Sequence, residues 1–284
     1  MKDMSGKIVI VTGANSGMGL ASSIELARLG ANVIMVCRNQ ARGEAALEQA
    51  RKESGNPDIE LMTCDLGSLA GIRSFGAAFK EKYDRLDVLL NNAGVITLKR
   101  ETTSDGFEAM MGVNHLGHFL LTHELLELLL RSRQGRIVNV SSGAHKVGRI
   151  HFEDPWLTKR FNVAKGYAQS KLANVLFTKE LARRLKNSSV TVNSLHPGAV
   201  STSLGVDRKS GFGKMAYKLL NPFFQTPLEG AGTAIYLAAS ADAESMTGQY
   251  FIKCKPAKVS AQANDPQLAE RLWVWSEGQV GISQ

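Results

Sequence analysis

Short apolar runs alternate with longer amphipathic stretches along most of the chain. The short runs are typical of strands covered on both faces. They are Ile8–Thr12, Ala31–Cys37, Ile59–Thr63, Val88–Leu90, Arg136–Val140, Thr191–Leu195 and Tyr250–Ile252. The longer stretches have helical spacing and are Met18–Leu29, Ala41–Glu53, Leu69–Tyr83, Ser104–Arg131, Ala164–Leu185 and Pro227–Ala239. Repeated strand–helix–strand units predict a parallel sheet with helices on both faces.

No linker, internal repeat or low-complexity tract interrupts this pattern. We therefore predict the α/β class, with residues 1–284 forming a single doubly wound Rossmann domain and a parallel sheet of about seven strands. A length of 284 residues suits one large α/β domain. In the tail after Lys255, the stretch Asp265–Trp275 predicts a short helix packed through Leu268, Leu272 and Trp275.

Composition and charge exclude several classes of protein. Hydrophobic residues make up 44% of the chain and charged residues 21%, which is typical of a globular protein and not of a disordered or fibrous one. The net charge of +8 comes from dispersed basic residues without interleaved aromatics, so we predict no nucleic-acid partner. Three scattered cysteines without a CxxC motif indicate buried free thiols in a reducing compartment.

Targeting segments and metal motifs are also missing from the sequence. The chain has neither a signal-peptide pattern nor an apolar run of membrane-spanning length, so we predict a cytoplasmic protein without a membrane anchor. His115, His118 and His123 share one predicted helix, but no HExxH motif or carboxylate cluster accompanies them. We therefore predict no metal site.

A glycine-rich turn follows the first predicted strand and opens the first helix. In a doubly wound fold this turn faces the pyrophosphate of a dinucleotide, and the helix N-terminus supplies free N–H groups for it. Gly13 allows the tight turn, Gly17 lets the backbone approach the phosphates, and Gly19 permits close packing of helix and strand. The turn TGxxxGxG therefore predicts a dinucleotide cofactor.

Arg38 distinguishes between the two nicotinamide cofactors. It follows the second strand, where an acidic residue would bind a ribose 2′-hydroxyl and an arginine accommodates a 2′-phosphate. We therefore predict NADP(H), with NAD(H) as the weaker alternative.

Six further motifs occur in a fixed order after the glycine turn. They are Cys64-Asp65-Leu66, Asn91-Asn92-Ala93-Gly94, Val113-Asn114-His115, Ser141-Ser142, Tyr167 with Lys171, and His196-Pro197-Gly198. In order and spacing the set resembles the short-chain dehydrogenase/reductase family from about Gly6 to about Ile252. The strand end at Arg38 and the stretch Ser170–Leu185 are similar to its retinol dehydrogenase-like branch, to which protochlorophyllide reductases are related.

The chemistry of hydride transfer explains the residue types in this set. A carbonyl that accepts hydride needs a proton donor at the developing alkoxide. Tyr167 and Lys171 are one helical turn apart, so the ammonium can approach the phenol and lower its pKa. The resemblance implies that Tyr167 is the acid/base, that Ser142 rather than Ser141 polarises the substrate oxygen, and that Asn114 holds a water in a proton relay.

The resemblance also implies the remaining cofactor contacts. They are Asn15, Ser16 and Met18 in the glycine turn, Asp65 and Leu66 at the adenine, Asn92, Ala93 and Gly94 at the adenosine ribose, Pro197, Gly198, Val200 and Thr202 around the nicotinamide, and Tyr167 and Lys171 at its ribose. Asn91 is expected to brace its strand instead of contacting the ligand.

Two segments are candidates for the substrate site, at about residues 143–166 and 201–226. The separation of 25 residues between Ser142 and Tyr167 is longer than in many members of the family. Phe152, Trp156 and Phe161 in the first segment indicate either a bulky apolar substrate or a cap on the core. We keep both interpretations.

The sequence thus predicts an NADP(H)-dependent oxidoreductase that interconverts a carbonyl compound and its alcohol. The alternatives are a C=C (enone) reductase, against which the YxxxK spacing argues, and a catalytically silent NADP(H)-binding regulator. A homodimer or homotetramer through the helices Ser104–Arg131 and Ala164–Leu185 is also expected from the family resemblance.

Overall fold

The structure, a computed structural model, describes residues 1–198 and 226–282. Its eight-stranded sheet has the order β3-β2-β1-β4-β5-β6-β7-β8, and every neighbouring pair is parallel except β7 and β8. The strands are β1 Ile8–Thr12, β2 Asn32–Cys37, β3 Ile59–Thr63, β4 Val88–Asn91, β5 Arg136–Val140, β6 Thr191–His196, β7 Tyr250–Ile252 and β8 Lys255–Pro256. The predicted doubly wound sheet is confirmed, and the short β8 is the strand that the sequence pattern missed.

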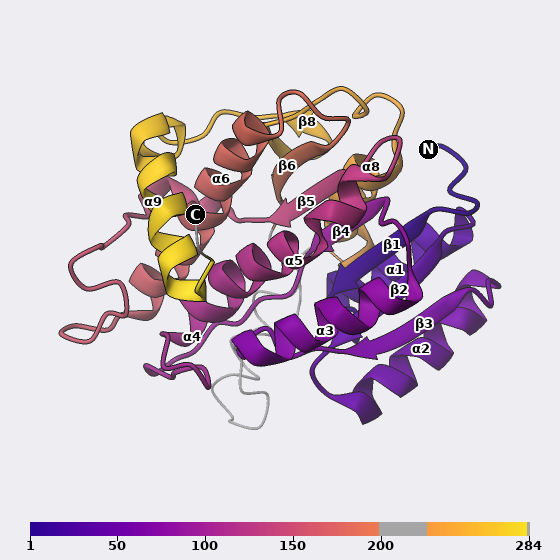
Figure 1. Ribbon diagram of the computed structural model, residues 1–284, viewed down its shortest axis with the longest axis horizontal. Coiled ribbons are helices and arrows are strands. Elements are labelled where there is room, and N and C mark those ends of the chain that lie inside the picture. Colours follow the sequence, from indigo (N-terminus) through magenta and orange to yellow (C-terminus); the bar gives the residue numbers. More distant parts are fainter. Residues whose placement is uncertain (199–225, 283–284) are drawn as a thin grey trace.

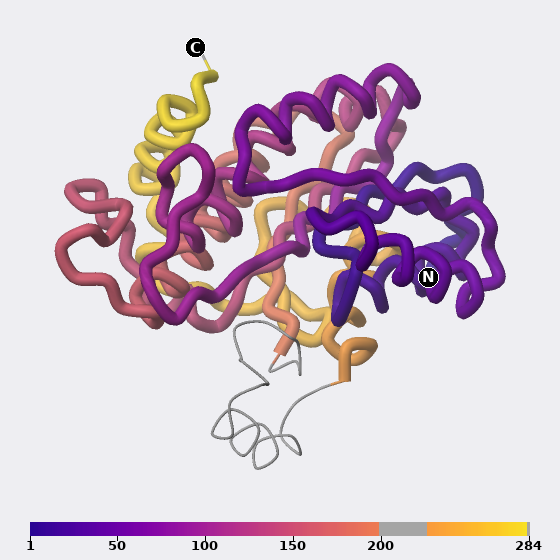
Figure 2. Tube along the Cα trace, turned by 90° about the horizontal axis from the view of Figure 1, so that it is seen from below, coloured from indigo at the N-terminus to yellow at the C-terminus, as the bar shows by residue number. Residues whose placement is uncertain are grey.

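Helices cover both faces of this sheet (Figure 1). One face carries α1 Gly17–Arg28, α2 Gln40–Ser54 and α8 Pro227–Ala239. The other carries α3 Leu69–Lys82, α5 His118–Leu130, α6 Val163–Arg184 and α9 Pro266–Val280. Figure 2 shows the purple α3 and the yellow α9 on one side of the sheet, with the orange α8 on the other. Within these described ranges, no helix is both long and apolar enough to cross a bilayer.

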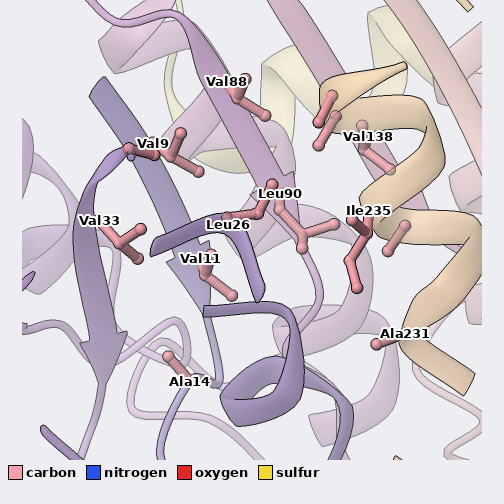
Figure 3. Close-up of a cluster of buried hydrophobic side chains, with 14 of the residues drawn as sticks. Val9, Val11, Ala14, Leu26, Val33, Val88, Leu90, Val138, Ala231 and Ile235 are labelled. Carbon is pink, nitrogen blue, oxygen red and sulfur yellow. The ribbon is translucent and has the colours of Figure 1, made fainter. Parts of the chain in front are cut away.

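Alternate strand residues build the two halves of the core. Val9, Val11 and Val33 point toward α1 and α8, as Figure 3 shows, whereas Ile10 and Ile34 point toward α3 and α5. Successive side chains of a strand face opposite sides of a sheet, so near-continuous apolar strands are required when both faces are covered. This burial explains why the apolar runs predicted the strands so closely.

The predicted helix Ser104–Arg131 is wrong as one regular helix. The chain first makes α4, Ala109–Met111, then a π-helix, η1, over Gly112–Gly117, and then α5. The fully buried Glu108 carboxylate accepts hydrogen bonds from two backbone amides of the first turn. It thereby caps α4 and determines where the helix begins. A Cβ on Gly117 would lie 2.4 Å from the Leu66 carbonyl oxygen, so η1 approaches the loop after β3 very closely.

The C-terminal helix α9 is longer than the predicted Asp265–Trp275 and packs beside α6. Asp265 caps its first turn by accepting from two backbone amides. The buried Trp273 ring lies 5.0 Å from the Phe119 ring of α5 and 6.0 Å from the Phe177 ring of α6. The chain's own tail therefore covers part of the surface through which the sequence predicted pairing of subunits.

Trp273→Ala is expected to lower the free energy of unfolding by about 3–5 kcal/mol, because it leaves a cavity between three helices. Val274→Ala is the matched control, since Val274 on the same helix is 45% exposed. Chemical denaturation of both variants measures the effect. Equal stability of the two variants would show that α9 contributes little to the core.

Candidate active site

The glycine turn between β1 and α1 is shaped by close backbone contacts. Gly13 and Gly17 have positive φ angles of 65° and 55°, a region that favours glycine. A Cβ on Gly19 would lie 2.4 Å from the Gly13 carbonyl oxygen, so α1 can start this close to the turn only with glycine there. The φ angle of Gly13 fits the tight turn and the close contact of Gly19 fits the close packing that the sequence predicts, whereas the approach of Gly17 to the phosphates stays a prediction.

The N-terminus of α1 lacks the side-chain cap that the other long α-helices starting from loops have in the part of the chain that the structure describes. Those caps are Asn39 on α2, Ser68 on α3, Asn162 on α6, Thr226 on α8 and Asp265 on α9. On α1, the Ser16 side chain makes no capping hydrogen bond and the first turn holds no acidic residue. Amides and a positive dipole end without a competing carboxylate fit a bound phosphate.

Arg38, Asp65 and Leu66 follow the ends of the neighbouring strands β2 and β3. Arg38 is exposed directly after β2, at the same sheet edge as the glycine turn. One Asp65 carboxylate oxygen accepts from the Gly67 amide at 2.9 Å, which fixes the turn that carries it. Leu66 is buried against η1. The edge thus presents a guanidinium where the sequence predicts a 2′-phosphate.

The segment after β4 is tied to the end of β1. The Asn92 side chain donates to the Thr12 carbonyl oxygen at 2.6 Å, and the Asn92 and Ala93 amides donate to the Thr12 hydroxyl at 2.9 Å. The Asn92 side chain therefore holds the end of β1 beside the glycine turn, although the sequence predicts that Asn92 lines the adenosine ribose. Asn91 donates to Asn139 on β5 and to Thr122 on α5, so it braces its strand as expected.

Tyr167 and Lys171 lie on α6 at the carboxyl ends of β4 and β5. The Lys171 ammonium lies 5.6 Å from the centre of the Tyr167 ring and donates to the Val140 carbonyl oxygen at 3.2 Å. A Cβ on Gly94 would lie 3.7 Å from the same ammonium, so the segment after β4 closes this side of the site. The helix spacing thus brings the phenol and the ammonium together.

Ser141 and Ser142 have different surroundings at the end of β5. The buried Ser141 hydroxyl donates to the Lys171 carbonyl oxygen at 2.7 Å, which anchors α6 to the sheet. The Ser142 side chain accepts from the Ala144 amide, and its hydroxyl is near enough to Tyr167 to act on the pKa of the phenol. Of the two hydroxyls, that of Ser142 is the one next to the phenol.

Asn114 lies in the π-helix η1, and π-helical turns are frequent at functional sites. Its side-chain oxygen accepts from the Val95 amide at 2.7 Å, while its side-chain nitrogen donates to the Val95 carbonyl oxygen and to the Ser170 hydroxyl, both at 3.1 Å. The side-chain amide is thus occupied by protein partners. A relay water at Asn114 would instead bind its backbone carbonyl oxygen, which has two lone pairs.

Burial shifts the pKa values of both α6 groups. It lowers the pKa of Lys171 to about 8, since the ammonium is removed from water. Burial also raises the pKa of Tyr167, and the neighbouring Ser142 hydroxyl only partly opposes this. The Tyr167 pKa of the protein alone is therefore raised and not lowered as the sequence predicts, although the nearby Lys171 ammonium still favours the tyrosinate over the neutral phenol. A phenol that stays protonated suits a proton donor.

The aromatic residues before Tyr167 pack mostly within the protein. The Trp156 ring stacks on Phe107 at 4.9 Å and lies 5.5 Å from Trp275 of α9, and Phe152 also packs edge-on against Trp275. For these two residues the structure favours a cap on the core over a substrate pocket.

Pro197 and Gly198 follow β6, with a positive φ at Gly198. Val200, Thr202 and the expected substrate segment 201–226, apart from Thr226, lie outside the described residues.

Three buried polar residues of the site were not predicted from the sequence. Thr12 links β1 to the segment after β4, Ser170 links Asn114 to the Tyr167 carbonyl oxygen at 2.9 Å, and His118 contacts both Thr12 and Asn114. Two signals in the sequence could have indicated these residues. Thr12 is a polar residue at the end of an apolar strand, and His118 follows Asn114 by one helical turn.

Comparison with known proteins shows which proteins this chain is similar to. The family model described as short chain dehydrogenase matches residues 7–211. Mouse (Mus musculus) retinol dehydrogenase 14 is 49% identical, over 98% of this chain and 87% of that protein. A crystal structure of an uncharacterised protein from Mycobacterium paratuberculosis is 34% identical with a TM-score of 0.80, over 99% of this chain and 96% of that one. A short chain dehydrogenase from Shigella flexneri, complexed with NADP, is 26% identical with a TM-score of 0.69, over 90% of this chain and all (100%) of that one.

Proposed function

The chain belongs to the short-chain dehydrogenase family, in its retinol dehydrogenase-like branch, and is an oxidoreductase; on that premise we propose that it interconverts a bulky apolar aldehyde or ketone and its alcohol with NADP(H). The observation that carries the proposal is the cluster of Ser142, Tyr167 and Lys171 at the carboxyl edge of the sheet, on the same edge as the glycine turn.

Each side chain has one role in the proposed reaction. The Ser142 hydroxyl donates to the substrate oxygen, and Tyr167 gives its proton to the alkoxide that forms. Lys171 then stabilises the tyrosinate electrostatically, since its ammonium is one helical turn away. When bound, NADPH would supply the hydride. The uncapped α1 N-terminus and Arg38 are the groups that would hold its phosphates.

The substrate class rests on the relatives. Retinol dehydrogenases 11 to 14 are 43–49% identical to the chain over 98% of its length, so we propose a retinoid-like aldehyde or alcohol. NADPH oxidation with retinal, compared with a small polar aldehyde such as glyceraldehyde, tests this class. A higher kcat/KM for retinal is expected, and a preference for the small aldehyde would contradict it.

The cytoplasmic location and the absence of an anchor stay predictions.

Arg38→Asp is expected to reverse the cofactor preference. The guanidinium that would pair with a 2′-phosphate is replaced by a carboxylate that repels it and can accept from a ribose hydroxyl. We expect kcat/KM for NADPH to fall about 100-fold relative to that for NADH. Arg42→Asp, which makes the same charge change in the first turn of α2, is the control. A wild-type protein that uses NADH as well as NADPH would contradict the assignment.

A further inference from the structure

A chain of buried hydrogen bonds connects the Asn114 backbone with the segment after β4. His118, at the start of α5, is 2% exposed, and both of its ring nitrogens have partners. Nδ1 lies 3.1 Å from the Asn114 carbonyl oxygen, and Nε2 lies 2.9 Å from the Thr12 hydroxyl. The Thr12 hydroxyl in turn accepts the amides of Asn92 and Ala93, each at 2.9 Å.

The donors and acceptors of this chain fit in only one direction. A carbonyl oxygen can only accept, so Nδ1 of His118 carries the hydrogen toward Asn114. Burial lowers the pKa of His118 to about 4, and the nearby Lys171 charge adds to this effect, so the ring is neutral at neutral pH and Nε2 is an acceptor. The Thr12 hydroxyl has one hydrogen and two acceptors within reach, Nε2 at 2.9 Å and the Leu90 carbonyl oxygen at 3.4 Å. Because Nε2 is the nearer acceptor, the hydroxyl donates to it, while the hydroxyl oxygen accepts the two amides.

We propose that His118 is a positioning residue that holds the Asn114 carbonyl oxygen and, through Thr12, the backbone of Asn92 and Ala93 in one fixed arrangement. This inference rests on the function proposed above. The Asn114 side chain is already occupied, so its carbonyl oxygen is the atom left to bind a relay water. His118 orients that carbonyl and at the same time ties it to the segment that would line the cofactor.

Three variants test this role through two separate measurements, the cofactor Kd from NADPH fluorescence and kcat with retinal. His118→Leu is expected to raise Kd several-fold and to lower kcat by about 10- to 100-fold, because small displacements in a site have effects of this size. His118→Asn keeps a donor near the position of Nδ1 and loses the contact with Thr12. We expect it to restore kcat to within about threefold of wild type while Kd stays raised.

His115→Leu is the matched control. His115 is equally buried one turn earlier, but its Nε2 lies 2.9 Å from the Ser276 hydroxyl of α9 instead of contacting Thr12. It is expected to lose stability with Kd and kcat unchanged. Unchanged Kd and kcat in His118→Leu would overturn the inference, as would a kcat in His118→Asn as low as in His118→Leu. The cofactor Kd can be measured without turnover. An error in the proposed reaction can therefore be distinguished from an error in the role of His118.

Discussion

Tyr167→Phe is expected to reduce turnover by about a thousandfold while the protein remains folded. The variant removes one oxygen atom, and with it the group that protonates the substrate alkoxide; positioned acid–base groups contribute factors of this order. NADPH should still bind, since the glycine turn and Arg38 are unchanged. Initial rates of NADPH oxidation with retinal, together with NADPH fluorescence titration, measure the two properties separately.

Tyr83→Phe is the matched control for this experiment. Tyr83 is partly buried at the end of α3 and stacks on Phe79, away from the sheet edge that carries the site. It should keep wild-type turnover. Retention of full activity by Tyr167→Phe would show that another group supplies the proton, and the assignment of the acid would then fail.

Lys171→Met is expected to lose activity to a similar extent and yet to stabilise the protein without cofactor. The shift of the Lys171 pKa to about 8 from 10.5 corresponds to roughly 3 kcal/mol of unfavourable burial at neutral pH. The variant also loses the hydrogen bond to the Val140 carbonyl oxygen, worth about 1 kcal/mol. Asn174 still donates to that oxygen, so no acceptor is left alone. We expect a net gain of about 2 kcal/mol at pH 7.

The pH dependence of this gain follows from the direction of the shift. Below pH 8 both the folded and the unfolded protein carry the Lys171 proton, and the folded state bears the full burial penalty. Between pH 8 and about 10.5 the folded protein releases that proton first, so the advantage of Met fades as the pH rises. Denaturation of both proteins at pH 7 and pH 10 measures this. A gain that stays constant or grows toward pH 10 would contradict the buried ammonium.

The strands and the glycine turn could be predicted from the sequence because both depend on residues close together in the chain. Valine and isoleucine at successive positions such as Val9 and Ile10 fill opposite faces of a covered sheet. Gly13, Gly17 and Gly19 stand where a side chain would force a different backbone or collide with it. Tyr167 and Lys171 are likewise related by helix spacing alone.

Features that depend on distant contacts could not be predicted in this way. The π-helix around Asn114 lies where Gly117 closely approaches the Leu66 carbonyl oxygen, a contact between segments far apart in the sequence, and the start of α4 is capped by the buried Glu108. From the sequence, Trp156 was equally consistent with contact to a substrate and with packing on the core. Its contact with Trp275 of α9 favours packing on the core. The direction of the Tyr167 pKa shift depends on its burial, which no spacing shows.

Transfer of deuterium tests the central claim most directly. The protein is incubated with retinal and NADPH that carries deuterium at both hydrogens of nicotinamide C4, and the product is analysed by mass spectrometry and NMR. We predict retinol with a single deuterium at the carbinol carbon, formed about a thousandfold more slowly by Tyr167→Phe. Deuterium on a former C=C carbon, or no transfer to any apolar carbonyl by a protein that binds NADPH, would contradict the proposed reaction.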